Sequence, residues 1–224
     1  MSYKESIAQV TLPSYNKKQE LFNGVSHALG LFVAFIIALI ALVKFFNNAL
    51  SLTNFFGLFI FVSTITAVYF VSALYHLTPI DAPEKRSFRV LDHCTIYLLI
   101  AGTYTPICLV IMQTHVVGLV MLIIEWSGAL LGIILNAFFF TKKLTMPISL
   151  ILYLGMGWLV MFCGGFLYMS MLSFAFVLAG GIVYSIGAIL YGIGHKNLNF
   201  HCIFHVFVLL STILQAIGVL LIYS

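Results

Sequence analysis

Residues 201–222, HCIFHVFVLLSTILQAIGVLLI, decide the fold class of this chain. The segment contains no Asp, Glu, Lys or Arg, and a helix of about 20 apolar residues is long enough to cross a bilayer. It therefore predicts a transmembrane helix. At its start His201 and His205 are four residues apart, so a helix places both imidazoles on one face, close enough to share a metal ion.

The composition extends this prediction to the whole chain. Of its 224 residues, 62% are hydrophobic and 7% are charged, and the mean hydropathy is +1.15. These values are far from those of soluble domains, so we expect an integral membrane protein. No cleavable signal precedes the first apolar segment, so the N-terminus is expected to remain. The four cysteines lie in apolar segments without a CxxC pair and predict no disulfide framework.

The apolar segments of spanning length predict an all-α, seven-transmembrane helix bundle. They cover residues 24–46, 55–77, 90–112, 116–139, 147–167, 171–193 and 201–222. The boundary between the fifth and sixth segments is the least marked, because it carries no charge. The separators are short, so we expect one transmembrane domain over residues 24–224, preceded by a cytoplasmic tail over residues 1–23.

The positive charges predict the orientation of the bundle in the cell membrane. Nine of the ten Lys and Arg residues fall in the N-terminal tail or in the second, fourth and sixth loops between spans, which lie on the same side of the membrane as the tail. Only Lys44 falls on the opposite side. The nine are Lys4, Lys17, Lys18, Lys85, Arg86, Arg89, Lys142, Lys143 and Lys196. Positive residues stay inside, which places the N-terminus in the cytoplasm and the C-terminus outside. The formal charge of +4 is thereby explained without nucleic acid.

This topology brings polar residues of three helices to one depth. His76 ends the second span, Asp92 begins the third, and His201 and His205 begin the seventh. All lie about 5 to 10 Å below the cytoplasmic interface. Polar side chains inside a bilayer normally face the bundle interior and find partners.

Three imidazoles with an open fourth position are typical of a catalytic zinc site. The sequence therefore predicts that His76, His201 and His205 bind Zn²⁺, with iron or manganese as alternatives. The His-x3-His pattern lacks the glutamate of the HExxH motif, so a general base must come from another helix, and Asp92 is the candidate. Ser72, one turn before His76, faces the same cavity or bonds to the carbonyl of residue 68.

The remaining polar residues in apolar segments receive less specific interpretations. His93 points about 100° away from Asp92 and is expected to support the site or the structure. His27 forms a stripe with Glu20 and Asn23 that either caps the first helix or supports the site, with capping preferred. His115 lies on the outer side, and His195 lies in the solvated sixth loop. Glu125 is expected to be a neutral, hydrogen-bonded anchor first and a relay residue second, with candidate partners Tyr104, Thr105, Tyr184 and Ser185.

Together these motifs resemble the hemolysin III family. The motifs are Ser72-x3-His76, Asp92, His201-x3-His205, Glu20-x2-Asn23-x2-Ser26-His27, and the stretch from Leu91-Asp92-His93 to Thr105-Pro106. That family is grouped with the progestin and adipoQ receptors, including the adiponectin receptors, and is more distantly similar to the alkaline ceramidases.

The resemblance covers nearly the whole chain and implies seven spans with a cytoplasmic N-terminus. It also implies that His76, His201 and His205 are zinc ligands, and that Asp92 is the acid that holds or activates the water at the metal. Ser72 matches the polar neighbour of that site. The chain lacks the long extensions of the animal receptors, which argues against a protein hormone as ligand.

Three functions are compatible with these residues. The first is a zinc-dependent hydrolase of lipid amides or esters in the cytoplasmic leaflet, with an acyl chain in a cavity inside the bundle, Asp92 as general base and Ser72 as oxyanion donor. The second is a lipid sensor without turnover that regulates lipid homeostasis. The third is a cytolysin, which ranks lower because a secreted pore former needs a water-compatible surface.

Overall fold

The computed structural model describes residues 3–194 and 197–223, so His195 and Lys196 of the sixth loop lie outside the described residues. Every regular element in this part of the chain is helical. In chain order the helices are α1 (Tyr3–Ala8), α2 (Lys17–Phe46), α3 (Leu52–Leu77), α4 (Lys85–Met112), α5 (Val116–Phe139), α6 (Thr145–Gly157), α7 (Leu159–Phe162), the 3-10 helix η1 (Gly165–Tyr168), α8 (Met171–Gly194) and α9 (Asn199–Leu221).

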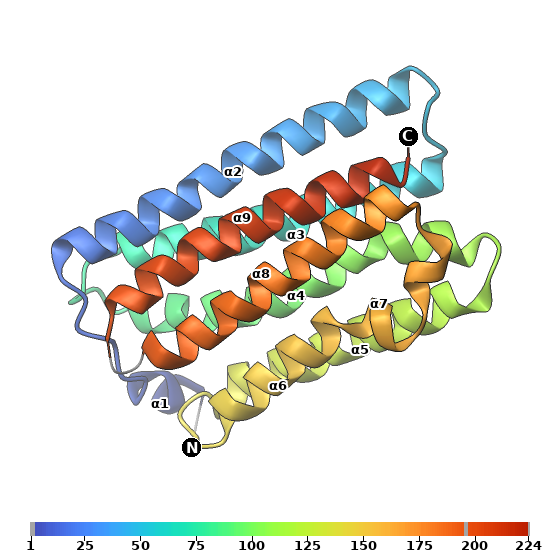
Figure 1. Cartoon of the computed structure of the whole chain (residues 1–224). Helices are drawn as coiled ribbons and strands as arrows, with labels where there is room; N and C mark the ends of the chain where they lie inside the picture. Colours follow the sequence, from blue (N-terminus) through green and yellow to red (C-terminus); the bar gives the residue numbers. More distant parts are fainter. Residues whose placement is uncertain (1–2, 195–196, 224) are drawn as a thin grey trace.

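Six of these helices are long and apolar enough to cross a membrane, and α6 is a shorter apolar helix. Many large apolar side chains are exposed on the outer surface of the bundle, such as Phe32, Leu131 and Ile151. Lipid tails are the environment in which such a surface is stable. The prediction of an all-helical membrane bundle is therefore confirmed, with the long helices lying side by side (Figure 1).

Helix α4 is the most enclosed of the long helices, because α3 packs along one side of it and α5 along another. The close approach of α3 depends on Gly102, where an added Cβ would lie 1.9 Å from Thr64 Oγ1. In the same way, Gly30 of α2 leaves room for the ring of Tyr69 on α3, which an added Cβ would meet at 2.2 Å. Small residues thus set the spacing of α2, α3 and α4, whose ends carry the predicted site.

The fifth predicted span is not one continuous helix over 147–167, so this prediction is wrong in detail. Helix α6 ends at Gly157, and α7 begins after Trp158, whose φ is −104° and ψ 6°. The Met161 N–H bonds to the Trp158 carbonyl, and the Gly157 carbonyl accepts the Tyr104 hydroxyl at 2.5 Å instead. A glycine exposes its carbonyl to this hydroxyl, and that contact from α4 interrupts the helix.

The residues before the first predicted span are folded. Helix α2 begins at Lys17, inside the expected tail 1–23, because Asn16 and Gln19 form a reciprocal capping box. Upstream, Val10 is buried beside Val90 and Cys94, and Arg86 Nε donates to the Val10 carbonyl at 3.1 Å. The segment before α2 is therefore fastened to the start of α4.

Helix α1 and the C-terminal end of α9 lie at opposite ends of the bundle (Figure 1). We call the first of these the α1 end; it also contains the starts of α2, α4 and α9 and the end of α3. At the other end, Lys44 Nζ donates to the Tyr223 carbonyl at 3.0 Å. The single positive charge assigned to the outer side is thus separated from the basic residues of the α1 end, and the cytoplasmic position of the α1 end stays a prediction.

Candidate metal centre

Three imidazoles meet at the α1 end. His76 ends α3, and His201 and His205 occupy the first two turns of α9; all three side chains are buried. One nitrogen of each lies within 4.8 Å of the others. The Nε2 atoms of His201 and His205 are 2.9 Å apart. The predicted convergence of residues from distant parts of the sequence is therefore present in the structure.

A carboxylate fixes the orientation of His76. Glu20 Oε2, from the first turn of α2, lies 2.6 Å from His76 Nδ1. A neutral imidazole that donates from Nδ1 keeps its lone pair on Nε2. His76 Nε2 is buried and has no hydrogen-bond partner in the described part of the chain. The ring therefore presents an unused lone pair, as a metal ligand does.

Glu20 is itself held by a buried lysine. Lys85 Nζ lies 2.8 Å from Glu20 Oε1 and also donates to the carbonyls of Tyr75, at 3.0 Å, and Thr78, at 2.7 Å. The Lys85 side chain is 1% exposed. An ammonium group has three protons to donate, and here each has an acceptor. The start of α4 thus fixes Glu20, and Glu20 fixes His76.

This donor set fits a zinc ion. Zinc binds imidazole nitrogens at about 2.0–2.1 Å, so two ligands of a tetrahedral ion lie about 3.4 Å apart. The His201–His205 pair needs only small side-chain rotations to reach that spacing. A carboxylate on the far nitrogen of a ligand is the usual support of a metal-bound histidine. The three residues could therefore hold the ion with His76 already oriented.

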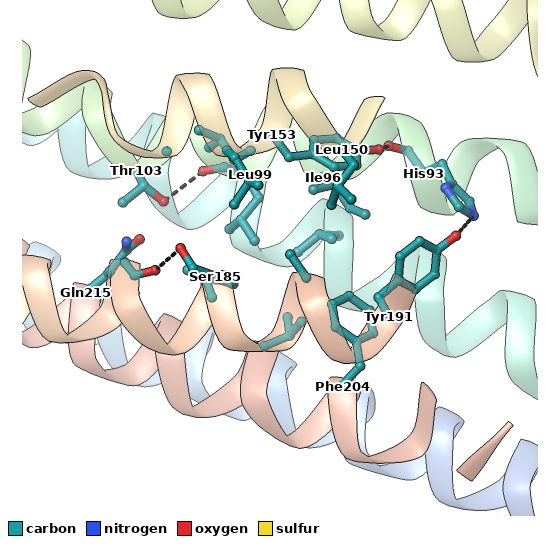
Figure 2. A pocket seen from close by; sticks show the side chains of 18 of the residues that line it. His93, Ile96, Leu99, Thr103, Leu150, Tyr153, Ser185, Tyr191, Phe204 and Gln215 are labelled. Carbon is teal, nitrogen blue, oxygen red and sulfur yellow. Dashed lines mark hydrogen bonds between the residues drawn. The ribbon is translucent and has the colours of Figure 1, made fainter. Parts of the chain in front are cut away.

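Asp92 and Ser72 lie beside the imidazoles, as the sequence predicted. The Asp92 carboxylate is near the Ser72 hydroxyl and within electrostatic range of His76. His93 Nε2 lies 3.4 Å from the Tyr191 hydroxyl (Figure 2). The His93 ring also packs against Phe140. His93 is therefore placed to support the site rather than to bind the ion.

The preferred interpretation of His27 as a helix cap is wrong. Asn16 caps α2, and His27 lies almost three turns further on, 4% exposed. Its ring centroid is 3.9 Å from that of His205 and 5.1 Å from that of Tyr69. The stripe of Glu20, Asn23 and His27 therefore faces the imidazole cluster, because residues three and four apart share a helix face.

Two cavities flank the cluster. The first, of about 120 Å³, is mostly apolar and runs between α4 and α6 on one side and α8 and α9 on the other (Figure 2). Along it lie Ile96, Leu99, Leu150 and Tyr153, with Ser72 and His205 at the cluster. An apolar cavity of this shape suits a hydrocarbon chain.

The second cavity, of about 370 Å³, lies at the α1 end and is lined by more polar groups. Residues 11–15 form one wall, and Tyr15 places its ring centroid 5.6 Å from His76 and 5.2 Å from His201. The opposite walls include Arg89 and His201. Asp92, His93 and Tyr191 line both cavities, so the two are adjacent beside the cluster.

Sequence reasoning missed several of these residues. It placed Glu20 in one stripe with Asn23 and His27 but preferred a capping role, and it did not predict the bond from Glu20 to His76. No sequence pattern marked Lys85, Arg89 or Tyr15 as residues of the site. The positions of the two basic residues were explained by the orientation of the chain in the membrane. Their roles depend on contacts between α2, α3, α4 and the segment before α2.

Glu125 does not have the hydrogen bonds that the sequence predicted. It is 0% exposed, and neither carboxylate oxygen has a partner in the described residues. All four candidate partners bond elsewhere: Tyr104 to Gly157, Thr105 to Ala101 and Trp126, Tyr184 to Thr212, and Ser185 to Gly181 and Trp158. The interpretation of Glu125 as a hydrogen-bonded anchor is therefore wrong, because each of the four candidate partners bonds to another group.

Sequence comparisons identify the family of the chain. The family described as "Haemolysin-III related" matches residues 15–216. The chain is similar to "Hemolysin-3 homolog" of Bacillus subtilis (strain 168), with 36% identity over 194 residues that cover 86% of this chain and 88% of that protein. It is also similar to "Hemolysin-3" of Bacillus cereus, with 35% identity over 194 residues that cover 86% of each chain.

Proposed function

Since this chain belongs to the haemolysin-III related family of membrane proteins, we propose that it is a zinc-dependent hydrolase of lipid amides or esters. The observation that carries the proposal is the position of the His76, His201 and His205 nitrogens, within 4.8 Å of one another and beside an apolar cavity. A zinc ion at this point would activate water as a nucleophile and polarise the substrate carbonyl.

The chain's own side chains supply the remaining steps. An acyl chain would lie in the apolar cavity, which brings its carbonyl to the end where Ser72 and Asp92 face the cluster. Asp92 would accept the proton of the attacking water and return it to the leaving amine or alcohol. The Ser72 hydroxyl would donate to the oxyanion that develops on the carbonyl. Tyr15 and residues 11–14 cover the α1 end of the site and limit the access of bulk water.

The metal assignment is tested by measuring zinc in detergent-purified variants. His205→Ala should lose the zinc that the unaltered protein retains, because two imidazoles bind it too weakly to survive purification. His115→Ala is the matched control, since His115 precedes α5 and stacks on Tyr168. Stoichiometric metal in His205→Ala would overturn the ligand assignment.

Hydrolysis is tested with Asp92→Asn, which removes the proton acceptor and keeps the size of the side chain. Zinc-loaded protein is incubated with a panel of acyl amides and esters, and released fatty acid is measured. The variant should keep its zinc and form product about 10²- to 10⁴-fold more slowly. Product at an unchanged rate would contradict the role of Asp92.

Lipid sensing without turnover is the second candidate, because the same cavity could retain a lipid without cleaving it. Zinc-loaded protein that retains lipid and forms no product from any substrate would favour this function. The names of the two relatives also suggest lysis, which predicts protein in the culture supernatant. We rank lysis lower because the exposed surface of the bundle is strongly apolar.

A further inference from the structure

The cavity at the α1 end contains a guanidinium with no partner at ion-pair distance among the described residues, and the nearest charge of opposite sign on its wall is the Asp92 carboxylate, which lies within electrostatic range. Arg89 is half-buried, lines this cavity and forms no ion pair within the residues that the structure describes. Its guanidinium lies 5.5 Å from the centroid of the Phe140 ring. The neighbouring Lys85 and Arg86 point elsewhere, toward Glu20 and the Val10 carbonyl. Arg89 is therefore available to an anion that enters the cavity.

Hydroxyl donors surround the same space. Tyr15, Tyr75 and Tyr191 line the cavity, and Thr11 and Ser14 contribute to its outer wall. The phenol hydroxyl of Tyr15 can donate one hydrogen bond into this space. A guanidinium together with several neutral donors suits a group with several acceptor oxygens. Phosphate is such a group.

The position of the two cavities on either side of Asp92 relates this space to the acyl chain. Asp92 lines both cavities, so a ligand that passes beside Asp92 would extend from the apolar cavity to the space beside Arg89. The bond that is cleaved would then lie beside Asp92, between a hydrocarbon part on one side and a polar head on the other.

We propose that the cavity at the α1 end binds the phosphate-bearing headgroup of a single-chain acyl lipid, with Arg89 as the residue that recognises the phosphate. This inference rests on the proposed function, because it assigns the acyl chain to the same apolar cavity. It adds the class of substrate: an acyl amide or ester whose leaving group carries phosphate.

The test is equilibrium binding to the zinc-loaded full-length protein, which requires no turnover. Dodecyl phosphate and 1-dodecanol have the same chain and differ in charge. The unaltered protein should bind the phosphate about tenfold more tightly, and Arg89→Gln should abolish this preference without changing the affinity for the alcohol. Lys143→Gln is the control, since Lys143 is exposed in the loop before α6 and should keep the preference.

An equal preference in Arg89→Gln and the unaltered protein would overturn the proposal. Inorganic phosphate that binds as tightly as dodecyl phosphate would also overturn it, because the site would then serve a free ion. Zinc content and product formation are measured on the same samples. A protein that forms no product and still shows the Arg89-dependent preference would refute the hydrolase and retain the headgroup site. A protein that forms product without this preference would retain the hydrolase and refute the headgroup site.

Discussion

A carboxylate at the α1 end of the bundle has hydrogen-bond partners, whereas the carboxyl group of Glu125 has none among the described residues. Glu20 is bonded to His76 and Lys85, and Lys85 in turn bonds to two backbone carbonyls. Glu125 is more deeply buried and has no hydrogen bond within the described residues. Polar groups inside a membrane protein are costly unless they are paired, so loss of a polar group should have opposite effects on stability in these two places.

The network around Glu20 also explains why the site tolerates a buried ammonium group. Lys85 compensates the charge of Glu20, and the two carbonyls accept its remaining protons. Removing any member leaves another without a partner, whereas removing the Glu125 carboxylate leaves nothing unpaired. The following changes test this difference, in order of expected effect.

Lys85→Met should have the largest effect on stability. It leaves Glu20 without its counter-charge and the Tyr75 and Thr78 carbonyls without a donor. We expect the free energy of unfolding to fall by about 3 kcal/mol or more, measured by thermal unfolding in detergent. Lys143→Met, in an exposed loop, should leave it unchanged. An equal loss in both variants would contradict a specific role of the buried lysine.

Glu20→Gln should weaken metal binding more than it weakens the fold. The amide oxygen accepts the Nδ1 proton of His76 more weakly than the carboxylate does, so the tautomer and orientation of the ring are held less firmly. Zinc affinity should fall about 10- to 100-fold in chelator competition. The visible spectrum of the cobalt-substituted protein should change as well, which a purely structural role would not cause. Glu84→Gln, at the exposed start of α4, is the control; unchanged zinc affinity in Glu20→Gln would contradict the positioning role.

Glu125→Met should have the smallest effect and the opposite sign. It removes an unpaired buried carboxyl group and keeps a side chain of similar length, so stability should stay the same or rise by about 1 kcal/mol. Zinc content should not change, because Glu125 is not in the histidine cluster. Ile124→Met, on the exposed face of the same helix, serves as reference. A large loss of stability would show that the acid has a partner in the membrane.

Much of the fold could be predicted from hydropathy, because each long apolar segment must satisfy its own backbone as a helix in a bilayer. The exception is the fifth segment, where Tyr104 of α4 takes the Gly157 carbonyl and interrupts the helix. Such a contact depends on the packing of another helix and has no local signal. The same reason explains the wrong cap at His27, whose ring packs on His205 from the other end of the chain.

The sequence by itself determined the membrane fold and the family. It also placed His76, His201 and His205 at one depth, because span length and the alternation of span direction set the depth of each residue. Only the tertiary structure decided that the three imidazoles meet, that Glu20 and Lys85 orient His76, that Tyr15 lies over the imidazoles, and that Arg89 lines a cavity adjacent to an apolar one. Depth follows from counting residues along a span. The rotation of each helix, and therefore which side chains touch, follows only from how the helices pack.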